Sequence, residues 1–225
     1  MLTIYGVYKS RAAWNIWMAL ELGLPFQHVP VIPAYRVESL YAPGAPPHSK
    51  SAEFLRVNLN GRVPAVVDGD LVLHQSLAIN MYLARKYGGP LAPANLTEEA
   101  RTLMWTHWAG TDVEPAAVDI LHHRLTYPAE KQMKHIADAA VVALQNPFTV
   151  LDAELAKSGW LVGERFTVAD LNVASVVNCA AAAPELFESA PLVRDWLARC
   201  HARPAYRELV RQREAQPAWT KQSAF

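Results

Sequence analysis

Ser10 is a candidate for catalysis because it lies in the loop between the expected first strand and first helix. The commonest role of a serine in this position is to cap the following helix, and position alone favours that role. No base stands beside Ser10 and no G-x-S-x-G turn is present, which argues against a hydrolase nucleophile. A serine hydroxyl can instead donate a hydrogen bond to a bound thiolate, and such a bond stabilises the charged form.

Two other positions carry backbone groups that could hold a ligand. Ser76 opens the helix expected at 75–87, and spacing alone favours a cap there. The alternative is an anion site, because free N–H groups at a helix start and a serine hydroxyl together bind a carboxylate. Val63 precedes Pro64, and its N–H and C=O could pair with an extended peptide as an added strand would.

The strongest local motif is FTVADL, residues 166–171. Thr167 can cap a helix, and Asp170 three residues later can reach back to the Thr167 N–H. Phe166 and Leu171 occupy the positions of a hydrophobic staple on either side of the cap. We interpret this motif as structural rather than catalytic.

The histidines and cysteines show no pattern typical of a metal site. His122 and His123 are adjacent, so they face different directions on a helix. Cys179 and Cys200 are the only cysteines and form no close motif. This usage fits a reduced, cytoplasmic compartment without disulfides, and we expect no bound metal.

The candidate residues near the N-terminus belong to a segment of alternating short strands and helices. Short apolar or β-branched runs bounded by Gly or Pro predict strands, and apolar residues at helical spacing predict helices. The turn Asp68-Gly69-Asp70 predicts a hairpin, and a Pro-rich loop occupies 34–49. In chain order we expect a strand at 2–5, a helix at 11–22, a strand at 27–31, a helix at 51–59, strands at 65–67 and 71–73, and a helix at 75–87.

Residues 88–96 are rich in Gly and Pro and predict a linker, after which strand signals largely disappear. The fold class is therefore a small α/β domain over 1–87 followed by an all-helical domain over 97–225. Helices are expected in the second domain at 97–125, 129–156, 168–182, 190–201 and 204–214.

Composition and charge exclude several classes of protein. The chain holds 21 Lys and Arg against 21 Asp and Glu, so it lacks the basic surplus of a nucleic-acid binder. It is 52% hydrophobic, which argues against disorder, and no apolar run reaches the ~20 residues of a membrane span. No charged leader precedes an apolar stretch at the N-terminus, so we expect no signal peptide. Residues 1–87 carry 8 basic against 5 acidic side chains, which suits the binding of a small anion.

Two segments together give the sequence a family resemblance that covers nearly its whole length. The stretch NLNGRVPAVVDGDLVLHQSLAINMYLARKYG, residues 58–88, resembles the glutathione-binding segment of cytosolic glutathione transferases, and FTVADL resembles the hallmark of their helical domain. The resemblance, closest to the serine-type, bacterial-like members, implies a thioredoxin-like, glutathione-binding first domain. It implies an all-helical second domain that binds the electrophile.

The resemblance assigns residues of this sequence to glutathione. Val63 and Pro64 match a cis-proline element in which the residue before the proline pairs with the cysteinyl backbone of glutathione. Gln75 and Ser76 match the pair that holds the γ-glutamyl carboxylate and amine, although many members have Glu or Asp at the first position.

Arg62 and Lys50 fall where polar or basic residues often face the glycyl carboxylate of glutathione. The chain is roughly ten residues longer than the family pattern in the loop around 34–48, a length typical of functional or mobile loops. We expect this loop to border the glutathione site as a lid. The insertion leaves the assignment of Lys50 open, with His48 beside it.

The resemblance also assigns the catalytic hydroxyl. Ser10 matches the catalytic serine of the serine-type classes, because WNIWMAL, residues 14–20, aligns with the helix after it. Tyr5 lies nearer the place of the hydroxyl in tyrosine-type classes, and Tyr8 is a further option. The absence of a cysteine from this loop argues against glutaredoxin-like thiol exchange.

The function implied is a glutathione transferase that uses glutathione as co-substrate, activates its thiol as a thiolate and directs it at an apolar electrophile. Trp105 and Trp108, three residues apart, are candidates for the electrophile pocket together with Tyr8. The resemblance further implies a cytoplasmic homodimer without nucleic-acid or membrane partners. The alternatives are a glutathione-dependent isomerase or dehalogenase, or a non-catalytic binding module of the same fold.

Overall fold

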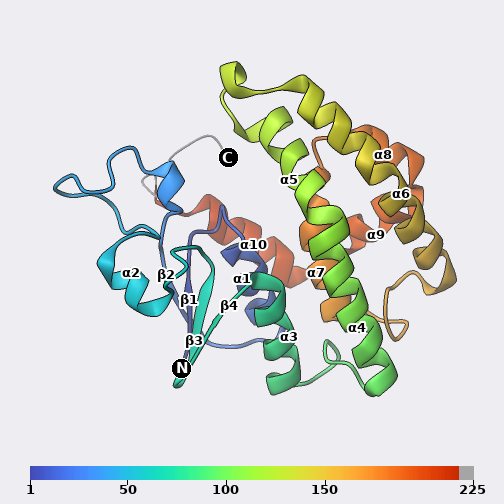
Figure 1. The fold of residues 1–225 in the computed structure, drawn as a ribbon. Coiled ribbons are helices and arrows are strands. Elements are labelled where there is room, and N and C mark those ends of the chain that lie inside the picture. The colour runs from blue at the N-terminus through green and yellow to red at the C-terminus, as the bar shows by residue number, and fades with distance from the viewer. Residues whose placement is uncertain (218–225) are drawn as a thin grey trace. The chain divides into compact units, whose positions relative to one another are not determined.

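The computed structural model describes residues 1–217, which form two compact units (Figure 1). The first unit comprises residues 1–87 together with 204–217, and the second comprises residues 88–203. Within residues 1–217, no helix is both long and apolar enough to cross a membrane.

The first unit is built on a mixed four-stranded sheet in the order β2-β1-β3-β4. The strands are β1 (Leu2–Tyr5), β2 (Phe26–Val29), β3 (Ala65–Asp68) and β4 (Leu71–His74). β1 runs parallel to β2 and antiparallel to β3, and β3 and β4 form the expected hairpin. This arrangement places the end of β1 next to the start of β3, because Tyr5 pairs with Ala65.

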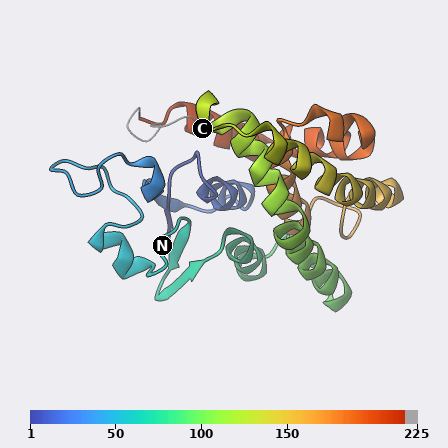
Figure 2. The same cartoon turned by 45° about the horizontal axis from the view of Figure 1, so that its top comes forward.

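Alternation along β1 separates two apolar layers. Leu2 and Ile4 are buried on one face of the sheet, where α1 (Ala12–Glu21) and α3 (Ser76–Tyr87) pack against each other. Tyr5 faces the other layer, which contains Phe54 of α2 (Ala52–Val57). In both views the loop between β2 and α2, which includes a 3₁₀ turn at Ala34–Arg36, stands out from the rest of this unit (Figures 1 and 2).

The structure groups α10 (Pro204–Glu214) with the first unit, whereas the sequence pattern assigned it to the helical domain. α10 packs along α1, and the Tyr206 ring meets the Trp17 ring edge-on at 4.9 Å between centroids. Helical periodicity shows that a segment has an apolar face but does not show which partner covers it. For α10 the partner is α1, a helix about 190 positions earlier in the chain.

The second unit is helical throughout its described secondary structure apart from an isolated bridge between Val162 and Arg165. α5 and the long α6 run side by side (Figure 2). The elements are α4 (Leu96–Trp108), a π turn (Ala109–Val113), α5 (Glu114–Leu121), a π turn (His122–Thr126), a 3₁₀ turn (Ala129–Lys131), α6 (Lys134–Ser158), α7 (Val168–Val177), a 3₁₀ turn (Asn178–Ala180), α8 (Pro184–Ser189) and α9 (Pro191–His201).

The single helix expected at 97–125 is therefore interrupted. Pro115 lies in the first turn of α5, where its missing N–H costs no hydrogen bond. The chain reaches it through the π turn at Ala109–Val113, which adjusts the helical hydrogen bonds just ahead of the proline. The periodicity of apolar residues persists through such a turn, so the sequence pattern alone did not reveal the break.

The FTVADL motif forms the expected capping box at the start of α7. Asp170 Oδ2 accepts hydrogen bonds from the Thr167 N–H at 2.9 Å and the Thr167 hydroxyl at 3.1 Å. Asp170 Oδ1 accepts from the Leu161 N–H at 3.1 Å and from Trp196 Nε1 of α9 at 3.0 Å. Burial raises the pKa of the Asp170 carboxyl to about 6, and these hydrogen bonds act in the opposite direction. One carboxylate thus joins the start of α7 to two other segments of the helical unit.

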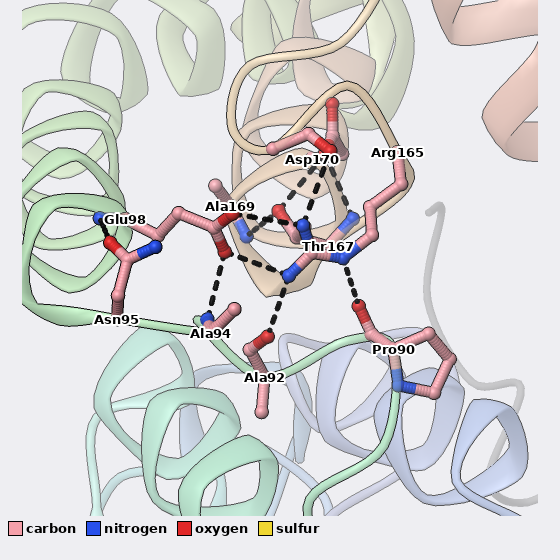
Figure 3. Close-up of polar contacts among 10 residues, drawn as sticks. Pro90, Ala92, Ala94, Asn95, Glu98, Arg165, Thr167, Ala169 and Asp170 are labelled. Atoms are coloured by element: carbon pink, nitrogen blue, oxygen red, sulfur yellow. Dashed lines mark hydrogen bonds and ion pairs between the residues drawn. The ribbon is translucent and has the colours of Figure 1, made fainter.

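Arg165, just ahead of this motif, attaches the 88–96 segment to the rest of the second unit (Figure 3). Its guanidinium donates to the carbonyls of Pro90 and Ala92 at 3.1 and 3.0 Å. It also forms a two-pronged ion pair with Glu98, at 3.0 and 2.7 Å. Glu98 additionally accepts the Ala94 N–H at 2.8 Å, so this segment is an ordered strap rather than a free linker.

We expect Glu98→Gln to destabilise the protein at neutral pH and to do so less as the pH falls. Hydrogen bonds from Arg165, aided by the Ala94 N–H, lower the pKa of Glu98 to about 2. A carboxyl whose folded-state pKa lies below its unfolded value contributes stability above about pH 4.5, and this contribution is lost as the pH falls towards 2. Urea unfolding between about pH 7 and pH 3 should show the two proteins converging, whereas a constant difference would contradict the assignment.

Candidate functional site

Ser10 lies in the turn that connects β1 to α1, and its hydroxyl is engaged within that turn. The hydroxyl donates to the Val7 carbonyl at 2.6 Å, and its oxygen accepts the Ala12 N–H at 3.2 Å. Ser10 therefore stabilises the start of α1, which begins at Ala12. To donate its single proton to a ligand, the hydroxyl must rotate away from Val7.

Gly6 brings the Ser10 turn close to the segment before β3. A Cβ on Gly6 would lie 2.5 Å from the Ala12 Cβ, 3.3 Å from the Val63 Cβ and 3.4 Å from Ser10 Oγ. Its φ of +139° is also a conformation that residues with a side chain rarely adopt. Only glycine allows these three groups to converge, so Ser10 and Val63 are neighbours although 53 positions separate them in the sequence.

The Val63–Pro64 peptide bond is cis, as the family resemblance implied. Val63 is half-buried and precedes β3 by two residues. Within residues 1–217, neither the N–H nor the C=O of Val63 makes a hydrogen bond. These two groups are consequently available to an extended peptide at this edge of the site.

Gln75 and Ser76 lie at the start of α3, but Ser76 is inside the helix rather than at its N-cap. The helix begins at Ser76 itself, and the Gln75 carbonyl accepts the first helical bond from the Ile79 N–H at 2.9 Å. The expectation that Ser76 caps the helix is therefore wrong, because the serine already lies in the first turn. Gln75 has a left-handed φ of +72°, which is uncommon for a residue with a side chain and often marks a functional position.

Asn15 connects α1 to this helix start. Its side-chain amide donates to the Ser76 carbonyl at 2.8 Å and to the Asn80 side chain at 2.7 Å, and both asparagines are fully buried. Asn15 thus fixes the first turn of α3 relative to the helix that follows Ser10. Sequence reasoning missed it, although an asparagine within the apolar stretch WNIWMAL was a detectable signal.

Lys50 and Arg62 are both exposed, and both are close to Gly61: Arg62 follows it in the chain, and the Lys50 side chain lies against it. A Cβ on Gly61, whose φ is +57°, would meet Lys50 Nζ at 2.6 Å and the Ser49 carbonyl at 2.8 Å. Lys50 Nζ also lies 3.5 Å from the Asn60 carbonyl. The structure therefore brings the two predicted basic residues into one region next to Val63.

The buried Asn58 side chain holds the backbone of this region, and the sequence reasoning also missed it. Its amide donates to the Arg62 carbonyl at 2.8 Å. Its side-chain oxygen accepts the Asn60 N–H at 3.1 Å. Asn58 thereby holds the short segment that carries Arg62 up to the cis-proline.

The segment 33–47, which we call the β2–α2 loop, has an ordered base. The Ile32 N–H donates to the Pro47 carbonyl and the Ser49 N–H donates to the Ile32 carbonyl, each at 2.9 Å. His48 is buried, with Nε2 2.9 Å from the Leu40 carbonyl and Nδ1 accepting the Lys50 N–H at 3.2 Å. His48 therefore folds into the loop, which leaves Lys50 as the basic side chain facing outward.

The two tyrosines near Ser10 are engaged elsewhere. Tyr5 packs against Phe54 in the apolar layer on the α2 side of the sheet. The Tyr8 hydroxyl donates to Gln212 of α10 at 2.5 Å, and burial raises its pKa. The Tyr8 hydroxyl, like that of Ser10, must therefore leave its present partner before it can donate to a ligand.

Family comparisons give this geometry its context. The family model described as the glutathione S-transferase N-terminal domain matches residues 1–85, and that of the C-terminal domain matches residues 114–204. Glutathione S-transferase 3 of Zea mays is 33% identical over 221 residues, which cover 93% of each chain. The chain belongs to the glutathione S-transferase family.

Two further relatives differ in name. A theta-class glutathione S-transferase from Xanthomonas axonopodis pv. citri, solved with glutathione bound, superposes with a TM-score of 0.78 at 27% identity, covering 93% of this chain and 98% of that one. A protein named disulfide-bond oxidoreductase YfcG, from Escherichia coli K12, is 31% identical over 160 residues, which cover 68% of this chain and 73% of its own. The thioredoxin-like and helical architecture expected of a glutathione S-transferase is thus confirmed.

We expect Gln75→Gly to weaken glutathione binding by about tenfold in this family member while leaving stability unchanged or higher. Glycine adopts the left-handed conformation without strain, so the substitution removes a cost of about 1 kcal/mol from the folded state. It also removes a side chain at the predicted γ-glutamyl position. Calorimetry and thermal unfolding measured on the same samples test both parts, and Gln27→Gly on β2 serves as a matched exposed control. Equal losses of stability in both variants, with unchanged affinity, would contradict a binding role for Gln75.

Proposed function

We propose that this protein is a glutathione transferase that binds glutathione along one edge of its first unit. The observation that carries the proposal is the convergence around Gly6 of the Ser10 hydroxyl and the unpaired backbone of Val63, in a chain of the glutathione S-transferase family. Glutathione is an extended peptide with a thiol in its middle, so it needs a backbone pairing partner and a hydroxyl near each other.

Three groups of residues fit the three parts of glutathione. Val63 offers its N–H and C=O to the cysteinyl backbone. Gln75 and Ser76 offer a side chain and the start of α3 to the γ-glutamyl end, where helical N–H groups favour a carboxylate. Lys50 and Arg62 offer positive charge to the glycyl carboxylate next to Gly61.

Ser10 stabilises the thiolate of bound glutathione in this proposal. A free thiol with a pKa of about 8.5 is only a few per cent ionised at neutral pH. A hydrogen bond to a charged group contributes roughly 1.5–3 kcal/mol, whereas the bond to Val7 that must be broken contributes roughly 0.5–1.5 kcal/mol. The exchange therefore lowers the thiol pKa by about one unit at about 1.4 kcal/mol per unit. The start of α1 adds a favourable partial charge.

The second unit supplies the apolar pocket for the electrophile in this proposal. Trp105 and Trp108 of α4 form an edge-on pair with centroids 5.1 Å apart, and Trp105 is buried. Their arrangement supports a rigid aromatic wall for an apolar electrophile.

We also propose a cytoplasmic homodimer. The outward face of α4 carries Leu96, Leu103 and Met104, which are 80, 45 and 52% exposed. Apolar side chains grouped on one helix support a contact with a second copy of the chain. Light scattering distinguishes a dimer from a monomer, and a monomer at micromolar concentration would sink this part.

The test of the proposed activity uses the wild-type protein. Calorimetry with glutathione should show binding at or below millimolar concentration, and a chlorodinitrobenzene should be conjugated with a rate that depends on both substrates. Binding without conjugation would favour a glutathione-dependent isomerase or dehalogenase. Absence of glutathione binding would favour a non-catalytic module.

A further inference from the structure

Three peptide units determine where the Ser10 side chain points, and each has a partner of its own. The unit after Ser10 is held by α1, because the Ser10 carbonyl accepts the Ala13 N–H at 3.0 Å. The unit between Val7 and Tyr8 is held by Gln216, two residues beyond the end of α10, because Gln216 Oε1 accepts the Tyr8 N–H at 2.8 Å. That same unit carries the Val7 carbonyl to which Ser10 donates.

The unit between Lys9 and Ser10 is held by Arg36 of the β2–α2 loop. Arg36 Nη1 donates a short hydrogen bond to the Lys9 carbonyl. A peptide unit is planar, so fixing the Lys9 carbonyl also fixes the Ser10 N–H and the direction in which the chain enters Ser10. Arg36 therefore acts on the residue that carries the proposed catalytic hydroxyl without contacting that hydroxyl.

The environment of Arg36 makes this contact firm. The Tyr35 hydroxyl lies 3.2 Å from Arg36 Nη2, and the guanidinium carbon lies 5.3 Å from the centroid of the Tyr35 ring. Burial lowers the pKa of the guanidinium, although arginine remains charged at any physiological pH. A half-buried guanidinium aimed at a backbone carbonyl has fewer alternative positions than an exposed one.

The β2–α2 loop therefore connects the two ends of the proposed glutathione site. It ends at Pro47, three residues before Lys50, where the glycyl carboxylate is expected. Arg36 lies three residues after the start of the loop and reaches the Ser10 turn, where the thiol is expected. One segment of chain thus contacts both regions.

We infer that Arg36 is a positioning residue for thiol activation, which couples the β2–α2 loop to the Ser10 turn. This inference rests on the proposed function. In its absence the Lys9–Ser10 peptide unit can reorient, and the hydroxyl then spends less time aligned with the thiolate. Arg36 acts on the pKa of the bound thiol, whereas Lys50 and Arg62 act on glutathione affinity.

The test compares Arg36→Met with Tyr35→Phe, which keeps the aromatic ring and the Lys9 contact but removes the tyrosine hydroxyl. Ultraviolet absorbance of the thiolate, titrated in the presence of saturating glutathione, reports the thiol pKa directly. Arg36→Met should raise this pKa and lower kcat/KM about fivefold at about pH 6.5, with recovery at about pH 9, where the thiol ionises unaided. Tyr35→Phe should match the wild type, and Arg36→Lys should lie between the two.

Amide hydrogen exchange of the protein without glutathione gives a second, independent readout. Arg36→Met should accelerate exchange in residues 9–13, and unchanged exchange would overturn the inference. A higher KM for glutathione with an unaltered thiol pKa would also overturn it, because Arg36 would then bind rather than position. If the wild type shows no thiolate band, the proposed function fails, whereas a wild-type band that Arg36→Met leaves unchanged refutes the role of Arg36 alone.

Discussion

Replacing Ser10 with alanine is expected to lower kcat/KM for glutathione conjugation about tenfold at about pH 6.5, with a smaller loss at about pH 9. In the proposed mechanism the hydroxyl exchanges its bond to the Val7 carbonyl for one to the thiolate, and the net gain of about 1–1.5 kcal/mol corresponds to about one unit of thiol pKa. Above the pKa of free glutathione the thiol ionises without help, so the two proteins converge.

Two variants separate this effect from a general disturbance of the loop. Tyr8→Phe removes the hydroxyl that donates to Gln212, and Tyr5→Phe removes one beside the α2 layer. Both should retain the wild-type pH profile. Ser10→Ala also loses the bond to the Ala12 N–H, so thermal unfolding must accompany the kinetics. Unchanged turnover in Ser10→Ala together with a loss in Tyr5→Phe would transfer the role to Tyr5.

Replacing Asp170 with alanine is expected to cost about 4 kcal/mol or more, the largest stability loss we anticipate for a single polar residue. The carboxylate accepts from two backbone N–H groups, the Thr167 hydroxyl and the Trp196 indole, and all of these are buried. Each donor left without a partner costs about 1–3 kcal/mol. The measurement should be made at about pH 8, where a carboxyl with a pKa of about 6 is ionised.

Asp152→Ala provides a matched control in the same unit. Asp152 also accepts two backbone N–H groups at a helix start, from Leu192 at 2.8 Å and Val193 at 3.2 Å, but one of these bonds is exposed to solvent. Its loss should cost about 1 kcal/mol, as for an ordinary cap. Equal losses in the two variants would show that burial of the Asp170 network adds nothing. Because Asp170 lies in the helical unit, the remaining folded protein should keep its affinity for glutathione.

Much of the fold follows from local pattern. Short β-branched runs, the Asp68-Gly69-Asp70 turn and helical spacing predicted the order of elements in residues 1–87, and the structure has that order. The capping box was also predictable, because its residues lie within four positions of each other. The family was recognisable from two short segments and their spacing, and the family models match both regions.

Long-range partners were not predictable from these patterns. The apolar face of α10 is evident in the sequence, but only the tertiary structure shows that this face packs on α1. The sequence predicts Ser76 as the N-cap of α3. In the structure the helix already begins at Ser76, and Gln75, with its left-handed φ, is the residue before it. The buried Asn15 resembles any polar residue in the sequence until its distant backbone partner, the Ser76 carbonyl, is known.

The sequence by itself determined the family, the two kinds of unit and the chemistry available at the Ser10, Val63 and Ser76 positions, because those depend on residue types and local spacing. Only the tertiary structure decided how these groups meet. Gly6 lets the Ser10 turn approach Val63, and Asn15 bonds to Ser76, each across more than 50 positions of the sequence. Arg36 joins two separate loops through its bond to the Lys9 carbonyl. It also decided the current state of the Ser10 hydroxyl, which donates to Val7. A hydrogen bond depends on distance and angle in space, and neither can be read from residue order.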